Sequence, residues 1–184
     1  MTKLTVHTRE SAPEGSHGIM DAYTERFGFV PNLVSILAES PAVLKGYATT
    51  YGLLDETDFS APEQQLIFLT ASRENGCRYC VAAHSMACKM VGLDDETIHA
   101  VRDGRPVLDP KLAAIADFTT KVVVKRGHVS DQDVETFITA GHTQAQVLEV
   151  LLGVSTKTIS NYMNHIAQTP LDEAFAPMAW EPTQ

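Results

Sequence analysis

The sequence has little positive charge, few cysteines and no long apolar run, and each shortage excludes a class of protein. Its 14 Lys and Arg residues are outnumbered by 23 Asp and Glu residues, which gives a net charge of −9. Phosphate contacts need clustered cations, so we expect no nucleic-acid partner. No apolar run approaches the roughly 18 residues of a membrane span, and residues 1–18 lack the apolar core of a secretory signal. We therefore expect a cytoplasmic protein with no membrane partner.

Two common kinds of catalytic loop are missing as well. The glycines are scattered and never form a phosphate loop between a strand and a helix, and there is no G-x-S-x-G segment. Three cysteines among 184 residues do not make a disulfide framework. With 44% hydrophobic residues the chain can bury a core without one. We predict a flexible polar N-terminal arm over residues 1–17 and a single domain over residues 18–184.

The domain is predicted to be almost entirely helical. Helix start signals recur, among them the cap-then-proline pairs at Ser40 and Asp109 and the capping boxes that begin at Ser60 and Ser130. Between these signals the apolar residues recur with a spacing near 3.6 residues. The predicted helices, each bounded by such signals, are 19–27, 31–39, 41–55, 61–75, 78–91, 95–103, 110–126, 131–140 and 144–168. The fold class is therefore all-α.

The start signals also repeat along the chain. Ser40 and Ser60 are followed, after a long interval, by Asp109 and Ser130 with nearly the same separation. This weak internal repeat is compatible with a duplicated helical unit and equally with chance.

Two of the three cysteines lie three residues apart, where a helix is predicted to begin. The motif is Cys77-x-x-Cys80-x-x-x-His84, and Gly76 precedes it. A dithiol at a helix N-terminus lies at the positive end of the helix dipole, which lowers thiol pKa values. His84 follows Cys80 by one turn and can reach its sulfur as a base or as a proton donor.

Three interpretations of the motif remain open. The first is a redox-active dithiol that cycles through a Cys77–Cys80 disulfide. The second is a metal site formed by the pair, His84 and a ligand from elsewhere; Cys88 is excluded from it, because it lies about 16 Å from Cys77 along a helix. The third is a purely structural role, which suits Cys88 best. It suits the pair less, because Arg78 indicates that this helix start lies near solvent.

The motif in its context resembles the carboxymuconolactone decarboxylase superfamily, in its AhpD-like alkylhydroperoxidase branch and closest to the peroxidase-related subgroup. The likeness rests on Cys77-x-x-Cys80-x-x-x-His84 and extends over roughly residues 19–180. It implies an AhpD-like all-helical fold assembled as a homo-oligomer, and an enzyme that reduces a small hydroperoxide. Cys80 is implied to attack the peroxide, Cys77 to resolve the intermediate as a disulfide, and His84 to belong to the proton relay.

The resemblance also implies what accompanies the reaction. No bound organic cofactor or metal is expected. The electrons are expected from an external dithiol reductant, which could be a lipoyl protein, a thioredoxin or a small thiol.

The sequence departs from the family at one relay position. Where the family has a glutamate, twelve residues before the first cysteine, this chain has Gln65. An amide cannot take a proton, so we expect His84 to be less basic and Cys80 less often ionised than in the family. Glu74, three residues before Cys77, is the candidate substitute; the alternative is that it marks an exposed helix end.

A polar group in the last helix is a further candidate. It could line a pocket above the dithiol or form an exposed or interface face. Its members are Asn161, Tyr162, Asn164 and His165.

Two other functions stay open. One is a lactone decarboxylase, like the branch that names the superfamily, although that chemistry does not need the cysteine pair. The other is a non-catalytic redox sensor whose disulfide alters its oligomer.

Overall fold

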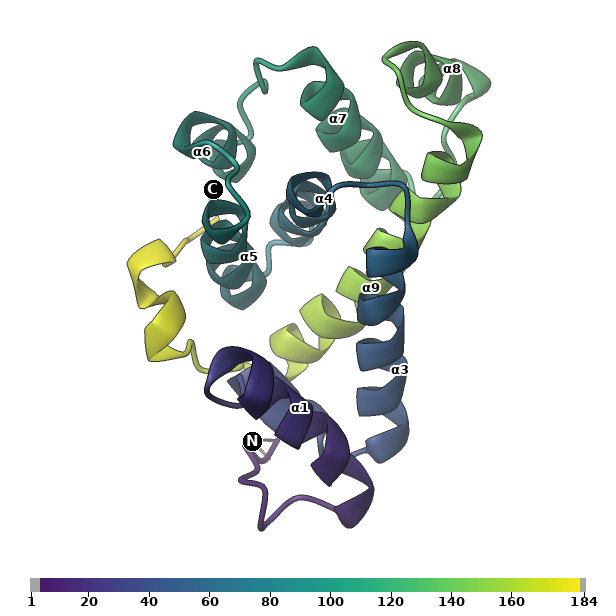
Figure 1. Ribbon diagram of the computed structural model, residues 1–184. Helices are drawn as coiled ribbons and strands as arrows, with labels where there is room; N and C mark the ends of the chain where they lie inside the picture. Colours follow the sequence, from purple (N-terminus) through teal and green to yellow (C-terminus); the bar gives the residue numbers. More distant parts are fainter. Residues whose placement is uncertain (1–3, 183–184) are drawn as a thin grey trace.

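A computed structural model describes residues 4–182. These residues form nine α-helices and three short 3-10 helices and no strand, which confirms the all-α class (Figure 1). In chain order the elements are η1 (Glu14–Ser16), α1 (His17–Phe27), α2 (Asn32–Leu37), α3 (Pro41–Gly52), η2 (Leu53–Glu56), α4 (Ala61–Glu74), α5 (Arg78–Met90), α6 (Asp95–Asp103), α7 (Pro110–Val124), α8 (Asp131–Thr139), α9 (Gln144–Ala167) and η3 (Glu173–Met178).

All nine predicted helices are present. The largest difference is at the end of α3, which stops at Gly52 because the chain tightens into η2. The capping boxes at Ser60 and Ser130 form as expected. The short helix η3 was not predicted, because it contains Pro177 and has no apolar periodicity to mark it. No helix within residues 4–182 is both long and apolar enough to cross a membrane.

The described part of the predicted N-terminal arm lies against the domain. Ser16 is fully buried and donates a hydrogen bond to the Ala38 carbonyl across 2.7 Å. The backbone N–H of His7 donates to the Ser35 carbonyl at 3.3 Å. Ala12 and Ser16 are the buried residues of the range 4–16, whose other residues lie at or near the surface, and residues 1–3 of the predicted arm lie outside the described residues.

Helix α4 is the central element of the fold. It packs against α5, α6, α7 and α9, and Figure 1 shows it enclosed between α5 and α7. One cluster of buried side chains surrounds it, with Leu66, Ile67 and Phe118 among its members. A second cluster joins α1, α2 and α3 to the start of α5, and both Cys77 and Cys80 belong to it. The dithiol thus lies inside the protein, where α5 meets the N-terminal helices.

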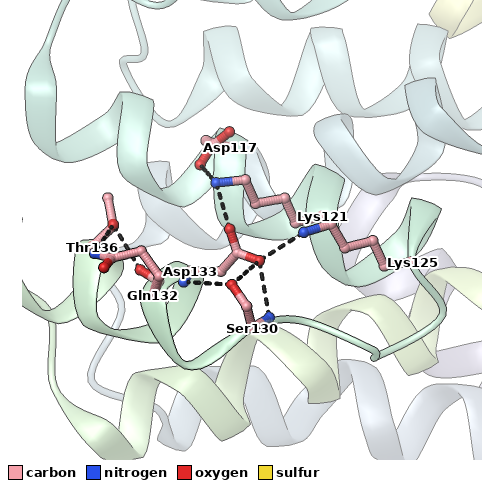
Figure 2. A network of polar contacts seen from close by, with 7 residues as sticks. All are labelled: Asp117, Lys121, Lys125, Ser130, Gln132, Asp133 and Thr136. Atoms are coloured by element: carbon pink, nitrogen blue, oxygen red, sulfur yellow. Dashed lines mark hydrogen bonds and ion pairs between the residues drawn. The ribbon is translucent and has the colours of Figure 1, made fainter.

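A network of ion pairs fastens α8 to α7 (Figure 2). The Asp133 carboxylate accepts hydrogen bonds from Ser130 in the capping box, and it pairs with Lys121 at 2.9 Å and with Lys125 at 2.7 Å. Lys121 also reaches Asp117, one turn earlier on α7. These partners, Lys125 first, lower the pKa of Asp133 below its usual value. The network orients α8 and includes no residue of α5.

Candidate active site

The turn between α4 and α5 places the dithiol. Gly76 has a φ of +65°, a conformation that strains any residue with a side chain. The N–H groups of Gly76 and Cys77 donate to the carbonyls of Arg73 and Ser72, both at 2.9 Å, which closes α4 in a Schellman motif. Cys77 is at once the N-cap of α5. This turn therefore fixes the point at which α5 begins and the direction in which Cys80 projects.

Both thiols point inward. Cys77 and Cys80 are each 1% exposed and carry free sulfurs, although Arg78 between them is exposed. The start of the helix lies near solvent as expected, because Arg78 is exposed, but both sulfurs lie beneath it. Cys88 is also buried, and burial raises its pKa to about 12. It belongs to the main core cluster.

The two thiols of the motif differ in their ionisation. Burial alone would raise the pKa of Cys80, but a hydrogen bond from Cys77 and the charge of Lys157 outweigh it and lower that pKa to about 5. The Asn164 amide also donates to the Cys80 sulfur at 3.2 Å, and the Ser160 hydroxyl lies 3.9 Å from it. The same hydrogen bond to Cys80, together with burial, raises the pKa of Cys77 far above its usual value. At neutral pH the pair is therefore one thiolate, Cys80, and one thiol, Cys77.

A buried lysine completes the site. Lys157 of α9 is fully buried, and its Nζ lies 2.7 Å from Nε2 of His84 and 5.4 Å from the centre of the Phe68 ring. Because the ammonium group donates to Nε2, the imidazole proton is assigned to Nδ1, which lies 2.9 Å from Oε1 of Gln65. Burial and the Lys157 charge lower the pKa of His84 well below its usual value. His84 is therefore a neutral imidazole held between an amide and an ammonium group.

Sequence reasoning missed Lys157, although a signal was present. Val154, Lys157, Asn161 and Asn164 recur at three- and four-residue intervals and so share one face of α9. All four are buried. A lysine on the inward face of a helix is rare unless it has a buried partner, and this position could have marked a site.

The candidate relay residues separate into one that reaches the site and one that does not. Gln65 contacts His84 as the resemblance implied. Glu74 does not belong to the group, because its carboxylate accepts hydrogen bonds from Arg73 at 2.6 Å and from Thr120 of α7 at 3.2 Å. A source of Cys80 ionisation that the sequence did not suggest is the charge of Lys157, which lowers the pKa of the thiol directly.

The four polar residues predicted in the last helix differ in how close they lie to the dithiol. Asn164 contacts both cysteine sulfurs. Asn161 accepts from the Asn75 amide at 2.9 Å and donates to Ser72 at 3.3 Å, so it fastens the turn before the motif to α9. His165 is exposed and lines the cleft beside Cys77 together with Asn164, whereas Tyr162 is exposed and lines neither cavity beside the dithiol.

Two cavities adjoin the dithiol. The smaller, about 120 Å³, is lined by Cys80, His84 and Lys157. Its walls are mostly apolar and aromatic, with Tyr23, Phe27, Tyr47, Tyr51, Tyr79 and Phe175 among them. The larger, about 600 Å³, is a cleft that Cys77 lines together with the end of α9 and the C-terminal tail. Within residues 4–182 no group of three or more His, Cys, Asp or Glu side chains is placed to hold a metal ion.

Comparison with solved structures shows that known proteins share this fold. Over 98% of this chain and 97% of the other, the structure superposes with a TM-score of 0.85 on the alkylhydroperoxidase AhpD core of an uncharacterized peroxidase-related protein from Ralstonia eutropha, at 22% sequence identity. A peroxidase-related protein from Silicibacter gives 0.80 at 18% identity, over 94% and 93% of the two chains. A cysteine-to-alanine variant of the debrominase Bmp8, in complex with 2,3,4-tribromopyrrole, gives 0.80 at 14% identity, over 97% and 96%. At these identities the likeness shows the fold, which is AhpD-like.

The sequence supports the same assignment. Residues 41–108, which contain the whole motif, match the carboxymuconolactone decarboxylase family. A comparison with curated protein sequences gives no match. The resemblance to the carboxymuconolactone decarboxylase superfamily is therefore confirmed by sequence over residues 41–108, and nearly the whole chain has the AhpD-like fold.

Proposed function

We propose that the protein is a thiol-dependent hydroperoxide reductase in which Cys80 is the residue oxidised by the peroxide. The observation that carries the proposal is a pair of free cysteines in which Cys80 lines an apolar cavity with Lys157 and accepts a hydrogen bond from the Asn164 amide. These surroundings lower the pKa of Cys80, while that of Cys77 is raised. The thiolate is the nucleophilic form of cysteine, and a neighbouring thiol is what a sulfenic acid needs to condense with. The protein shares its fold with peroxidase-related proteins, which supports this class of activity.

The reaction divides into two steps at the dithiol. The Cys80 thiolate attacks the terminal oxygen of the hydroperoxide, the O–O bond breaks, and Cys80 becomes a sulfenic acid while the other oxygen leaves as alkoxide or hydroxide. The Cys77 thiol then condenses with the sulfenic acid, which releases water and forms the Cys77–Cys80 disulfide.

Lys157 and His84 are placed to supply the proton that the leaving oxygen takes. Both line the same cavity as Cys80, and they are hydrogen-bonded to each other. The ammonium group of Lys157 can give a proton to the alkoxide directly or across the cavity. The neutral imidazole of His84 accepts a hydrogen bond from that ammonium group. His84 then acts as the partner that orients Lys157 rather than as the base that ionises Cys80.

The catalytic cycle closes when an external dithiol reduces the disulfide. The oxidising equivalents of one hydroperoxide leave the protein as one oxidised dithiol, so the chemistry itself calls for no bound organic cofactor. A lipoyl group, a thioredoxin or a small dithiol could serve as the donor.

The decisive experiment measures peroxide consumption with dihydrolipoamide as reductant. The Cys80→Ser variant should lose the activity, and the Cys88→Ser variant should keep it, because Cys88 is a buried core thiol outside the cavity. Retained turnover in Cys80→Ser would overturn the proposal. Disulfide formation without turnover would favour a redox sensor instead. Decarboxylation of a lactone with both cysteines dispensable would favour the decarboxylase alternative.

A second candidate function is reductive removal of a halogen from an aromatic ring. The aromatic walls beside Cys80 favour it, together with the fold shared with the debrominase Bmp8. In balance, an aryl bromide, the Cys80 thiolate and the Cys77 thiol would give the arene, bromide and the disulfide, and the thiol proton would pass to the arene carbon. Bromide release from 2,3,4-tribromopyrrole, set against peroxide consumption by the same preparation, separates the two candidates.

A further inference from the structure

Three tyrosines of the N-terminal helices line the apolar cavity beside Cys80, and the proposed reaction uses none of them. Tyr23 lies on α1, and Tyr47 and Tyr51 lie one turn apart on α3. The rings of Tyr47 and Tyr51 are 6.0 Å apart, and Tyr47 belongs to the same buried cluster as Cys80. These phenol groups therefore reach the cavity from α1 and α3, whereas Lys157 reaches it from α9.

The hydroxyl of Tyr47 forms no hydrogen bond with another protein group of residues 4–182. Other tyrosines of the cavity wall differ in this respect. The Tyr79 hydroxyl donates to the Asp172 carboxylate at 2.5 Å. The Tyr51 hydroxyl interacts with the Gln65 side chain. Tyr47 is therefore a donor without an acceptor in the described protein.

The Tyr47 hydroxyl belongs to a buried residue at the cavity wall. Tyr47 is 3% exposed and lines the cavity. Burial raises the pKa of Tyr47 well above its usual value, and the neighbouring Tyr23 and Tyr51 raise it further. The phenol therefore keeps its proton at neutral pH and can donate it in a hydrogen bond. Because a buried donor without an acceptor costs free energy, this hydroxyl calls for an acceptor within the cavity.

Tyr23 supplies a second donor of the same kind. In the described part of the chain its hydroxyl also bonds to no protein group, and burial raises its pKa. Two phenol donors from helices that contact each other suit a carbonyl oxygen, which has two lone pairs to accept them. The hydroperoxide group is not that acceptor. In the proposed reaction its terminal oxygen meets Cys80, and its leaving oxygen takes a proton from Lys157.

We propose that Tyr47 and Tyr23 bind a carbonyl oxygen of the substrate, so that the protein selects small hydroperoxides that also carry a ketone group. This inference rests on the proposed function and names the substrate class of its cavity. The volume of about 120 Å³ is close to the roughly 150 Å³ that holds a benzene ring, so a molecule of about six heavy atoms fits. Hydroperoxyacetone has this size. The thiolate step is unchanged: the O–O bond breaks, Cys80 takes the terminal oxygen, and the remainder leaves, with a proton, as hydroxyacetone.

The selection follows from what an analogue without the carbonyl would do. An alkyl group in place of the carbonyl oxygen leaves the Tyr47 hydroxyl without an acceptor. A site that hydrogen-bonds its substrate rejects the analogue that lacks the bonding atom, whereas an apolar pocket discriminates only weakly between alkyl groups. Removing the Tyr47 hydroxyl should therefore abolish the discrimination.

The test compares hydroperoxyacetone with isobutyl hydroperoxide, which has a methyl group where the ketone has its oxygen. Stopped-flow measurements give the rate constant of Cys80 oxidation for each. We expect Tyr47→Phe to lower the ratio of the ketone rate to the alkyl rate by at least tenfold. The control Tyr162→Phe should leave this ratio within twofold, because Tyr162 is exposed and lines neither cavity. The intrinsic reactivities of the two hydroperoxides cancel, since each protein meets the same pair.

Two outcomes of this comparison would contradict the proposal. An unchanged ratio in Tyr47→Phe would show that the hydroxyl does not meet the carbonyl oxygen. Equal slowing with both hydroperoxides would show that the hydroxyl serves the hydroperoxide group, which removes the reason for a ketone in the substrate.

Unfolding in urea checks that the Tyr47 hydroxyl has no partner inside the ligand-free protein. Tyr47→Phe should leave the urea midpoint unchanged or raise it, because the variant loses no internal hydrogen bond. Tyr79→Phe should lower the midpoint, because it loses the bond to Asp172. A similar fall in both variants would reveal an internal acceptor for Tyr47 and refute the proposal.

Binding of a ketone without peroxide separates this inference from the proposed function. Butanone should protect Cys80 from alkylation by iodoacetamide in the unmodified protein and in Tyr162→Phe. In Tyr47→Phe the half-protecting concentration of butanone should be at least fivefold higher. Equal protection in all three proteins would overturn the carbonyl site. Protection as expected, with no oxidation of Cys80 by either hydroperoxide, would instead count against the proposed function and leave the ketone site standing.

Discussion

Nζ of Lys157 and Nε2 of His84 lie 2.7 Å apart in the interior of the protein, where the lysine is fully buried. Within residues 4–182 no carboxylate forms an ion pair with this ammonium group. Its charge acts instead on Cys80, whose pKa it helps to lower. A buried charge is costly unless it is compensated, and the thiolate provides the compensation. The charge of Lys157 therefore stabilises the Cys80 thiolate across the buried site, and this interaction exists only while the dithiol is reduced.

The first prediction is that Lys157→Met raises the pKa of Cys80. In the unmodified protein the thiolate, and with it the rate of alkylation, should persist down to about pH 5 and fall below it. Without the ammonium group, burial dominates and the midpoint should move up by at least one pH unit. The pH dependence of iodoacetamide alkylation measures this midpoint. It is followed by fragmentation mass spectrometry of the tryptic peptide 79–89, which distinguishes Cys80 from Cys88.

Lys89→Met is the matched control for that experiment. Lys89 lies on α5, is exposed, and pairs with Asp95 at the surface. Its removal should leave the midpoint of Cys80 unchanged. An unchanged midpoint in Lys157→Met itself would show that the hydrogen bond from Cys77 suffices to hold the thiolate.

The second prediction concerns the reduction potential of the Cys77–Cys80 disulfide. Lys157 stabilises the reduced form, because only that form contains the Cys80 thiolate. Lys157→Met should therefore make the disulfide harder to reduce, by about 30 mV for each tenfold loss in the equilibrium constant. Equilibration with lipoamide and dihydrolipoamide at a series of ratios, at pH 7, gives the value. If the reduction potential becomes less negative in Lys157→Met, the charge of Lys157 does not stabilise the Cys80 thiolate.

The lowered pKa of Cys80 also predicts how the stability of the reduced protein depends on pH. Between about pH 5, the lowered pKa of Cys80, and its higher value in the unfolded chain, the unfolded state binds more protons, so the reduced protein gains stability as the pH rises. Urea unfolding of the reduced protein at pH 6 and pH 8 should show this gain, and Cys80→Ser should reduce it to the part that His84 contributes, because the pKa of His84 is also lowered in the folded protein. A gain of equal size in Cys80→Ser would assign the pH dependence to other groups.

The sequence predicts features that depend on local signals, such as helix ends, and misses those that depend on contacts between residues far apart in the chain. Helix ends are set by local chemistry, so Ser60, Ser130 and the glycines after the helices predicted nearly every boundary. The contact between Gln65 and His84 was implied by the resemblance alone. Lys157 was not predicted, because its partner is 73 residues away and only the tertiary fold brings α9 against α5. Glu74 was misplaced for the same reason: the orientation of its side chain is decided by Thr120 on a distant helix.

The third prediction is that the protein assembles into a homo-oligomer through α9. Leu148 and Ile166 are 68% and 77% exposed, and Leu151 and Tyr162 lie on the same side of the helix between them. Together they form an apolar stripe about 27 Å long on the face opposite Lys157. Light scattering at micromolar concentration should give a multiple of the single-chain mass.

The variant Ile166→Glu should shift that equilibrium towards single chains. Val124→Glu is the control, because Val124 is comparably exposed but lies at the end of α7, away from the stripe. Dissociation by Val124→Glu and not by Ile166→Glu would place the interface elsewhere. A clean single chain in the unmodified protein would contradict the prediction as a whole.

The last prediction concerns Gln65, whose Oε1 lies 2.9 Å from Nδ1 of His84. If the family's glutamate worked by ionising the attacking cysteine, Gln65→Glu should speed the oxidation of Cys80 by tenfold or more. The structure argues otherwise, because Cys80 is already a thiolate at neutral pH while residue 65 is neutral. A carboxylate at residue 65 would instead favour the charged imidazole and raise the pKa of His84, which would bring a second positive charge against Lys157. We therefore expect Gln65→Glu to change the rate of Cys80 oxidation at pH 7 by less than twofold, while the His84 pKa rises in NMR titrations. Stopped-flow oxidation of both proteins, and of each in a His84→Ala background, decides between the two accounts. A tenfold gain that disappears with His84 would show that the imidazole, and not Lys157, governs the thiolate.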